Sequence, residues 1–166
     1  MKILFLPRDG IRLYQELLAS ETSREALRFY RPVETACGIE VTAATLGSAL
    51  TLMADIRWYV KRYMRGVLFE IAPGVFSTHR LAFELFYDRE IKLPGSWDYR
   101  LIYRMKDGRV VREEQILPGA ERPLSVSAGT PEIEVWCTED EYHGGISVVA
   151  LEDDTGEEAA DEADQP

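Results

Sequence analysis

The chain has 166 residues, 46% of them apolar and 10% aromatic, and a formal net charge of −10. A chain of this length buries roughly 70% of the surface that its unfolded form exposes, which excludes a mini-protein held together by disulfides or metal. No apolar stretch approaches the roughly 20 residues of a membrane span, and the start of the chain lacks the apolar core of a secretory signal. We therefore expect a cytoplasmic protein with no membrane segment and no cofactor.

The negative charge is concentrated towards the end of the chain. Residues 55–112 carry a net charge of +5, residues 113–150 carry −7 and residues 151–166 carry −8. We expect one globular α+β domain over residues 1–151 and a disordered acidic tail over residues 152–166, because the tail is too polar to offset its ordering entropy. Such a tail is commonly a solubilising appendage; alternatively, it competes with nucleic acid for the basic surface of the domain.

The first part of the chain is predicted to form a strand followed by two short helices. Residues 2–6 are an apolar run closed by a turn signal, which is typical of a buried strand. Residues 11–18 repeat apolar side chains at spacings of three and four. Thr22 and Glu25 fit a capping box that would start a second helix, ending before Pro32.

A strand and a long helix are predicted next. Residues 38–44 alternate apolar and polar side chains, which favours a strand. Residues 46–64 carry apolar side chains on one helical face, which predicts a single long helix. Gly66 stands where a C-terminal cap is expected.

The second half of the chain is predicted to be mostly sheet. Residues 67–71 fit a strand, and residues 80–87 fit either a strand or a helix. Residues 99–105 and 109–116 flank Asp107-Gly108, a pair that suits the type I′ turn of a β-hairpin. Further strands are predicted at residues 124–126, 133–137 and 146–151, the last two joined around residues 143–145. The whole pattern predicts an α+β fold in which an antiparallel sheet packs one face against the long helix and the N-terminal helical pair.

The segment around residue 60 combines basic and aromatic side chains. Such a combination can bind nucleic acid, because the rings stack on bases while the cations meet phosphates. It is also typical of a helix with a solvated basic face, and no known nucleic-acid-binding motif accompanies it. The candidate nucleic-acid residues are Arg57, Trp58, Lys61, Arg62 and Arg65, with the first, third and fifth on one helical stripe.

Our first functional hypothesis is a non-catalytic protein-binding module, such as an inhibitor, an immunity or anti-defence protein, or an accessory subunit. Its acidic surface would meet a basic patch on the partner, and aromatic side chains would anchor the contact. The candidate partner-binding residues are Trp97, Tyr99, Glu113, Glu114, Glu139, Asp140, Glu141 and Tyr142, with Trp136 as a further anchor. Nucleic-acid binding is the alternative.

An enzyme is the second alternative, with His79 as the residue to test. Residues 76–80 hold a histidine, two hydroxyl groups and an arginine, but they do not form a nucleophile elbow. Glu139, Glu141 and His143 could share a metal ion, although acidic turns are common for other reasons, so no metal is expected.

Two further groups of side chains have more than one interpretation. Cys37 and Cys137 lie 100 positions apart without metal-ligand spacing, which favours free buried thiols over a disulfide. The predicted hairpin is rich in basic side chains, which form either a basic patch on the sheet or a solvated face. The basic side chains of the predicted hairpin are Arg100, Arg104, Lys106, Arg109 and Arg112.

Overall fold

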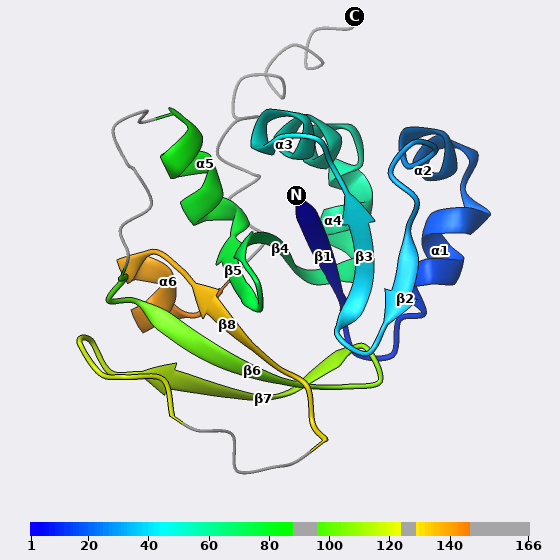
Figure 1. Ribbon diagram of the computed structural model, residues 1–166. Coiled ribbons are helices and arrows are strands. Elements are labelled where there is room, and N and C mark those ends of the chain that lie inside the picture. Colours follow the sequence, from blue (N-terminus) through cyan, green and yellow to red (C-terminus); the bar gives the residue numbers. More distant parts are fainter. Residues whose placement is uncertain (88–95, 124–128, 147–166) are drawn as a thin grey trace, which may run out of the picture.

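The protein is described by a computed structural model over residues 1–87, 96–123 and 129–146 (Figure 1). The predicted strand at residues 124–126, nearly all of the predicted strand at 146–151 and the predicted tail at 152–166 lie outside the described residues. Within the described part, no helix is long and apolar enough to cross a membrane.

Eight strands of the described residues form one sheet in the order β2-β3-β1-β4-β5-β8-β6-β7. Neighbouring strands pair antiparallel, except that β5 and β8 are parallel. The strands are β1 Lys2–Pro7, β2 Val33–Thr35, β3 Gly38–Thr42, β4 Met64–Ala72, β5 Val75–Thr78, β6 Arg100–Lys106, β7 Arg109–Ile116 and β8 Glu132–Trp136. The predicted α+β class is confirmed.

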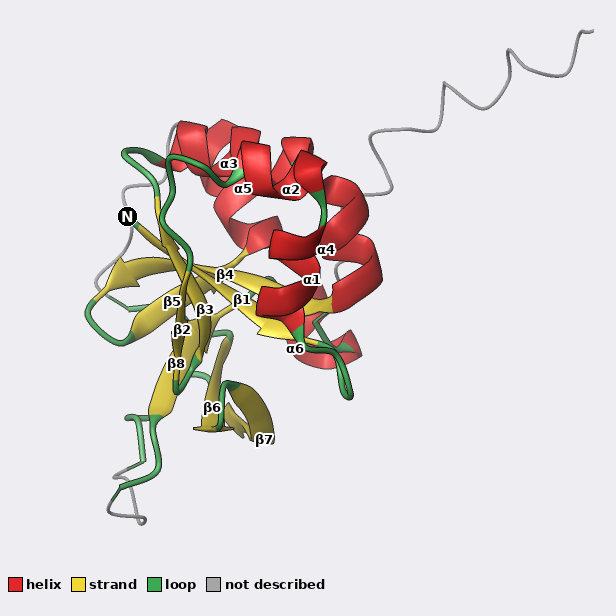
Figure 2. Ribbon diagram, turned by 90° about the vertical axis from the view of Figure 1, so that its right-hand side faces the viewer, coloured by secondary structure: helices red, strands yellow, loops and turns green. Residues whose placement is uncertain are grey.

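Helices α1 to α4 gather on one side of the sheet, as Figure 2 shows. The six helices within the described residues are α1 Leu13–Ala19, α2 Glu21–Ala26, α3 Leu46–Asp55, α4 Arg57–Tyr63, α5 His79–Tyr87 and α6 Glu139–Gly144. The predicted pair of short N-terminal helices is confirmed, and the sheet is covered by more helices than the sequence indicated.

Strand β1 is buried on both faces. Ile3 and Phe5 join a core formed with α1 to α4, whereas Leu4 and Leu6 join a second core formed with β6 and β8. A strand covered on both sides is apolar along its whole length instead of alternating. The run of apolar residues at the start of the chain therefore reflects a strand whose one face packs against helices and whose other face packs against later strands of the same sheet.

The predicted single long helix at residues 46–64 is wrong. The chain breaks at Ile56, which has a non-helical backbone (φ −104°, ψ 17°) between α3 and α4. Both helices bury their apolar stripe in the same core, so the hydrophobic spacing did not reveal the break. Met64 and Gly66 pair with Pro7 and Leu6 of β1, so they belong to strand β4 and Gly66 is no helix cap. Pairing with β1 ends the helix earlier than the local pattern indicates.

Three other predicted boundaries need correction. The N-cap of α2 is Ser20 and no side chain caps it, so Thr22 does not start a capping box, and the helix ends at Ala26. Residues 79–87 form helix α5, which resolves the open choice there. Residues 143–145 do not form a turn between strands, because the capping box of Thr138 and Glu141 starts helix α6.

The predicted hairpin around Asp107 and Gly108 is confirmed as β6 and β7. Both turn residues have positive φ (52° and 76°), as a type I′ turn requires.

Candidate functional site

Helix α4 displays a large exposed aromatic side chain, Trp58, which is 58% exposed. The ring meets Tyr59 and Tyr63 edge to face, with centroids 5.0 and 5.9 Å away. The guanidinium of Arg62 lies 5.2 Å from the indole centroid, within cation–π range. Trp58 is therefore held by three neighbours while it faces solvent.

Two local features determine which side of α4 faces outward. Val60 is buried, as are Ile56 and Met64 four residues before and after it, which fixes the inner face. The hydroxyl groups of Tyr59 and Ser20 share a hydrogen bond, which links α4 to the junction between α1 and α2. Trp58 and Arg62 are thereby directed away from the core.

A second cation reaches α4 from the loop between β1 and α1. The guanidinium of Arg8 donates to the carbonyl oxygen of Lys61 at 2.7 Å, and the backbone N–H of Arg8 donates to the carbonyl of Tyr63 at 2.9 Å. Arg8 and Lys61 are 53 positions apart, so sequence spacing gave no signal for this contact.

The predicted nucleic-acid residues come together, although not on one helical stripe. Arg57, Trp58, Lys61 and Arg62 lie on α4, whereas Arg65 lies on β4 and pairs with Glu113 at 3.3 Å. Arg57 and Lys61 are half-buried. We call the set Arg8, Arg57, Trp58, Lys61, Arg62 and Arg65 the α4 surface.

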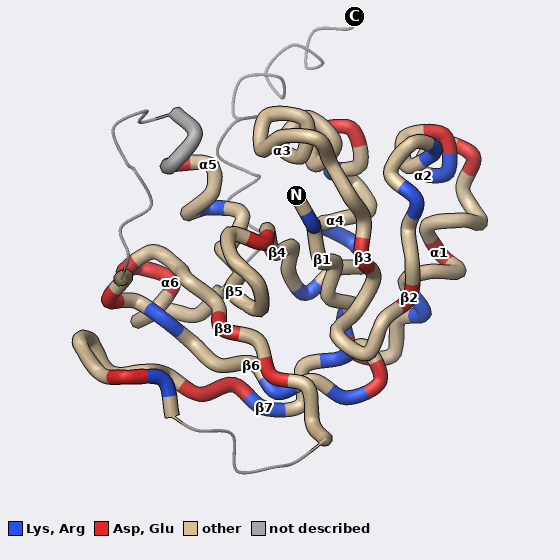
Figure 3. The backbone as a smooth tube through the Cα atoms, viewed as in Figure 1, with Lys and Arg blue, Asp and Glu red and all other residues tan. Residues whose placement is uncertain are grey.

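The predicted acidic partner-binding residues mostly meet arginines of the same chain. Glu113 pairs with Arg65, and Glu114 pairs with Arg112 at 2.7 Å and with Arg104 at 3.5 Å. The tube in Figure 3 shows basic residues along β6 and both acidic and basic residues along β7, the strand paired with it. The acidic third of the chain therefore packs against its basic middle.

Helix α6 holds the other predicted acidic residues. Asp140 pairs with Arg80 at 3.6 Å, and Glu139 is exposed. Glu141 is only 5% exposed and accepts hydrogen bonds from the hydroxyl of Thr78 at 2.7 Å and from the backbone N–H of Thr138 at 3.2 Å. The carboxylate of Glu141 thus ties the start of α5 to the start of α6.

The predicted aromatic anchors form one cluster at α6, in which Tyr142 is buried and Trp97, Tyr99 and Trp136 are half-buried. The rings of Trp97 and Trp136 stack with centroids 6.4 Å apart, and the indole of Trp97 donates to the carbonyl of Cys137 at 2.8 Å. Tyr99 lies 5.6 Å from Tyr142, whose hydroxyl donates to the carbonyl of Ile116 at 3.0 Å. These rings are engaged with one another and with the backbone.

The predicted basic patch on the hairpin is largely neutralised. Arg100 pairs with Glu134 at 3.7 Å, and Arg104 pairs with Glu132 at 3.0 Å. Arg109 donates to the carbonyl oxygens of Arg8 and Ile11. Alternation along β6 and β8 places these opposite charges on one face of the sheet.

His79 lies at the start of α5 between aromatic rings. Its centroid is 5.8 Å from that of Phe69 and 6.4 Å from that of Phe83. Burial lowers the pKa of His79 to about 4, so the imidazole is neutral at pH 7. The neighbouring Ser77 is fully buried and donates to the carbonyl of Thr78, so its hydroxyl is not exposed to solvent.

The two cysteines are free thiols, as predicted. Cys137 is buried, and desolvation together with the nearby Glu141 and Glu113 raises its pKa to about 12. Cys37 is only half-buried, and burial also raises its pKa. Among the described residues, no group of three or more His, Cys, Asp or Glu side chains could hold a metal ion.

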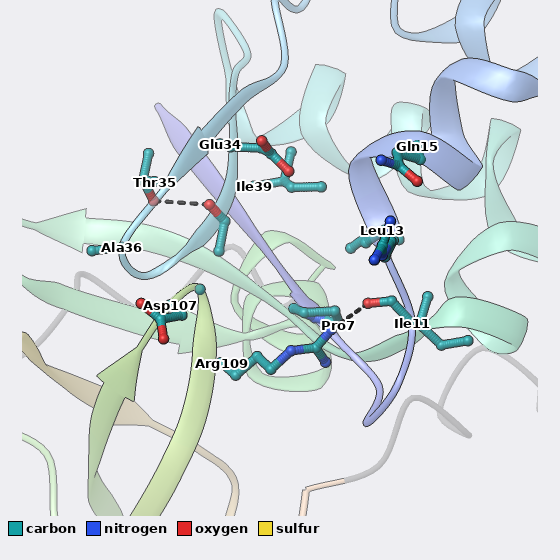
Figure 4. Close-up of a pocket in the computed structure, with 13 residues that line it drawn as sticks. Pro7, Ile11, Leu13, Gln15, Glu34, Thr35, Ala36, Ile39, Asp107 and Arg109 are labelled. Atoms are coloured by element: carbon teal, nitrogen blue, oxygen red, sulfur yellow. Dashed lines mark hydrogen bonds between the residues drawn. The ribbon is translucent and has the colours of Figure 1, made fainter.

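An open pocket of about 460 Å³ lies where the hairpin tip meets the β2–β3 turn (Figure 4). Leu13 and Ile39 contribute buried apolar side chains to its lining, and Glu34, Asp107 and Arg12 contribute exposed charges. The volume is in the range of small-ligand sites. Its charges are of both signs, so the lining favours no ligand class.

These features define a mixed α+β protein with an aromatic and basic surface centred on helix α4. A protein-family model described as "Family of unknown function (DUF5804)" matches residues 1–91, more than half of the chain. The chain belongs to this family. No curated protein and no solved structure matches it significantly. The matched residues include β1 to α5, and with them the whole α4 surface.

Proposed function

We propose that the protein is a non-catalytic binding module that acts by contact with another protein, as an inhibitor, an immunity or anti-defence protein, or an accessory subunit. The observation that carries the proposal is the exposed Trp58 with Arg62 packed over its ring. Trp and Arg dominate the binding energy of protein interfaces, and a side chain already held in place loses little entropy on binding.

The charges around Trp58 indicate the kind of partner. Glu113, Glu114 and Asp140 form ion pairs with arginines of the same chain, so they are poorly placed to meet a basic partner. Arg8 and Arg62, by contrast, form no ion pair among the described residues. We therefore place the contact on the α4 surface, with a partner that offers an apolar pocket bordered by acidic groups.

Nucleic-acid binding by the same surface is the second candidate function. It is favoured by the contact that brings Arg8 beside Lys61, next to a ring on which a base can stack. The net charge of −10 opposes it, because phosphates are repelled by an acidic chain. Affinity for nucleic acid would fall steeply with salt as counterions are released.

The test is capture of partners from a native lysate with the tagged full-length protein. The variant carries Trp58→Ala and Arg62→Ala. The matched control carries Phe29→Ala and Arg28→Ala, because Phe29 is 80% exposed and Arg28 lies 5.3 Å from its centroid. The control removes the same kind of cation–π pair from another part of the surface.

We expect a stoichiometric protein that survives nuclease treatment and is lost with the α4 variant only. Recovery of RNA or DNA that nuclease or moderate salt removes would favour the second candidate. A protein retained equally by wild type, variant and control would overturn the assignment of the contact to α4.

A further inference from the structure

We propose that the acidic segment at residues 151–166 docks on the α4 surface of its own chain, against Arg8, Lys61 and Arg62. If the segment docks there, it competes with a partner for the α4 surface, and this consequence rests on the proposed function. The docking itself is measured without any partner, so the docking and the proposed function can be disproved separately.

The position of Ile146 gives the first argument. Ile146 is half-buried against the second core, and it lines a small cavity of about 20 Å³ together with Arg65, Gly66 and Glu113. Arg65 lies only two residues beyond the end of α4. The last described residue before the acidic segment is thus adjacent to the α4 surface.

The length of chain that follows allows the contact. The first acidic residue, Glu152, comes six positions after Ile146. Six extended residues span about 20 Å, and Ile146 lines the same small cavity as Arg65, which follows the end of α4 by two residues. The acidic residues can therefore reach Arg65 and the end of α4 that precedes it.

Charge supplies the attraction. Residues 151–166 hold eight acidic and no basic side chains. Arg100, Arg104 and Arg112 already face carboxylates within the domain. Within the described residues, Arg8, Arg57 and Arg62 form no ion pair, so the domain leaves their charges uncompensated on the α4 surface. A short tether raises the effective concentration of the segment to the millimolar range, which populates contacts that are individually weak.

The test compares amide NMR spectra of two full-length proteins at low salt. In one variant all eight acidic residues of the segment are changed to their amides, which removes the charge and keeps the length. The changes are Glu152→Gln, Asp153→Asn, Asp154→Asn, Glu157→Gln, Glu158→Gln, Asp161→Asn, Glu162→Gln and Asp164→Asn. We expect shifts at α4 and at the β1–α1 loop, and we expect these shifts to vanish in 1 M salt, where the Debye length is about 3 Å.

A second comparison tests the surface. Lys61→Gln with Arg62→Gln should move the amide signals of residues 151–166, whereas Arg24→Gln with Arg28→Gln, which removes two exposed cations from the α2 region, should not. A synthetic peptide of residues 151–166 should restore the native shifts to the amidated chain only at millimolar concentration.

Identical α4 signals in the native and amidated chains at low salt would overturn the proposal. Shifts that grow with protein concentration would also overturn it, because they would assign the contact to a second copy. If the Lys61/Arg62 variant and the Arg24/Arg28 variant moved the signals of the segment equally, the segment would have no preferred surface. This result would also overturn the proposal.

Discussion

The backbone N–H of Gly108 donates a hydrogen bond of 2.9 Å to the carbonyl oxygen of Ala36. Gly108 lies at the tip of the β6–β7 hairpin, and Ala36 lies in the turn between β2 and β3. The β2–β3 hairpin forms one edge of the sheet, and the β6–β7 hairpin forms the other edge. The contact therefore brings the two ends of one sheet together, and it explains how β1 is buried on both faces (Figure 1).

Replacing Gly108 tests this closure. Gly108 has φ +76°, and an added Cβ would lie 3.3 Å from the carbonyl oxygen of Thr35. Gly74 has a similar φ of +74° with nothing within 4 Å, so Gly74→Ala measures the backbone cost alone, about 1 kcal/mol. We expect Gly108→Ala to lower the free energy of unfolding by about 1 kcal/mol more than that. Urea unfolding measures the free energy of unfolding of both variants. Equal losses for Gly108→Ala and Gly74→Ala would mean that the hairpin tip does not depend on its close contact with the β2–β3 turn.

The hydrogen bond between Thr78 and Glu141 is expected to stabilise the second half of the fold. Thr78→Val keeps the shape but removes the donor to a buried carboxylate and the acceptor for the N–H of Leu81. We expect a loss of about 2 kcal/mol in the free energy of unfolding, because buried polar groups are left without partners. Thr78→Ser retains the hydroxyl group and should lose clearly less. A valine variant as stable as the serine variant would contradict this role.

Stability should fall between neutral and acidic pH because of His79. Its pKa is lowered from 6.5 to about 4 by burial, so below pH 6.5 the unfolded chain binds a proton that the folded chain does not. The stabilisation is complete above pH 6.5, is lost progressively down to about pH 4, and amounts to at most about 3 kcal/mol. His79→Gln should show a shallower fall over this range in urea unfolding. The same slope in both proteins would rule out His79 as the cause.

The two thiols should differ in reactivity. Alkylation requires the thiolate, and a pKa of about 12 leaves Cys137 almost entirely protonated at pH 8. Cys37 also has a raised pKa but is more exposed. Mass spectrometry of the native protein treated with iodoacetamide should therefore find Cys37 modified well before Cys137. In urea, where the chain is unfolded, we expect the two thiols to react at equal rates. Equal rates in the native state as well would show that the burial of Cys137 is not maintained in solution.

Trp58 should matter for binding and little for stability. Because it is 58% exposed, Trp58→Ala removes little buried area, and we expect the free energy of unfolding to change by less than about 1 kcal/mol. Ile56→Ala, at the buried break beside it, should cost about 3 kcal/mol because it leaves a cavity. Thermal unfolding of the two variants gives the comparison. A large loss for Trp58→Ala would assign the ring to the core.

Local patterns were sufficient for several elements. The apolar run at the N-terminus predicted a buried strand, and Asp107-Gly108 predicted the hairpin, because each depends on the conformational preferences of adjacent residues. The free state of Cys37 and Cys137 also followed from their spacing. Where the pattern fitted both a strand and a helix, at residues 79–87, only the structure resolved the choice.

The sequence by itself determined the α+β class, the buried first strand and the turn of the hairpin, because short-range propensity and periodicity govern those features. Only the tertiary structure decided that the helix breaks at Ile56, that Met64 enters a strand beside β1, and that Arg8 lies against Lys61. It likewise decided which carboxylates meet arginines of the same chain. Each of these depends on pairing between residues far apart in the chain, and the free energy of such pairing leaves no local pattern by which to predict it.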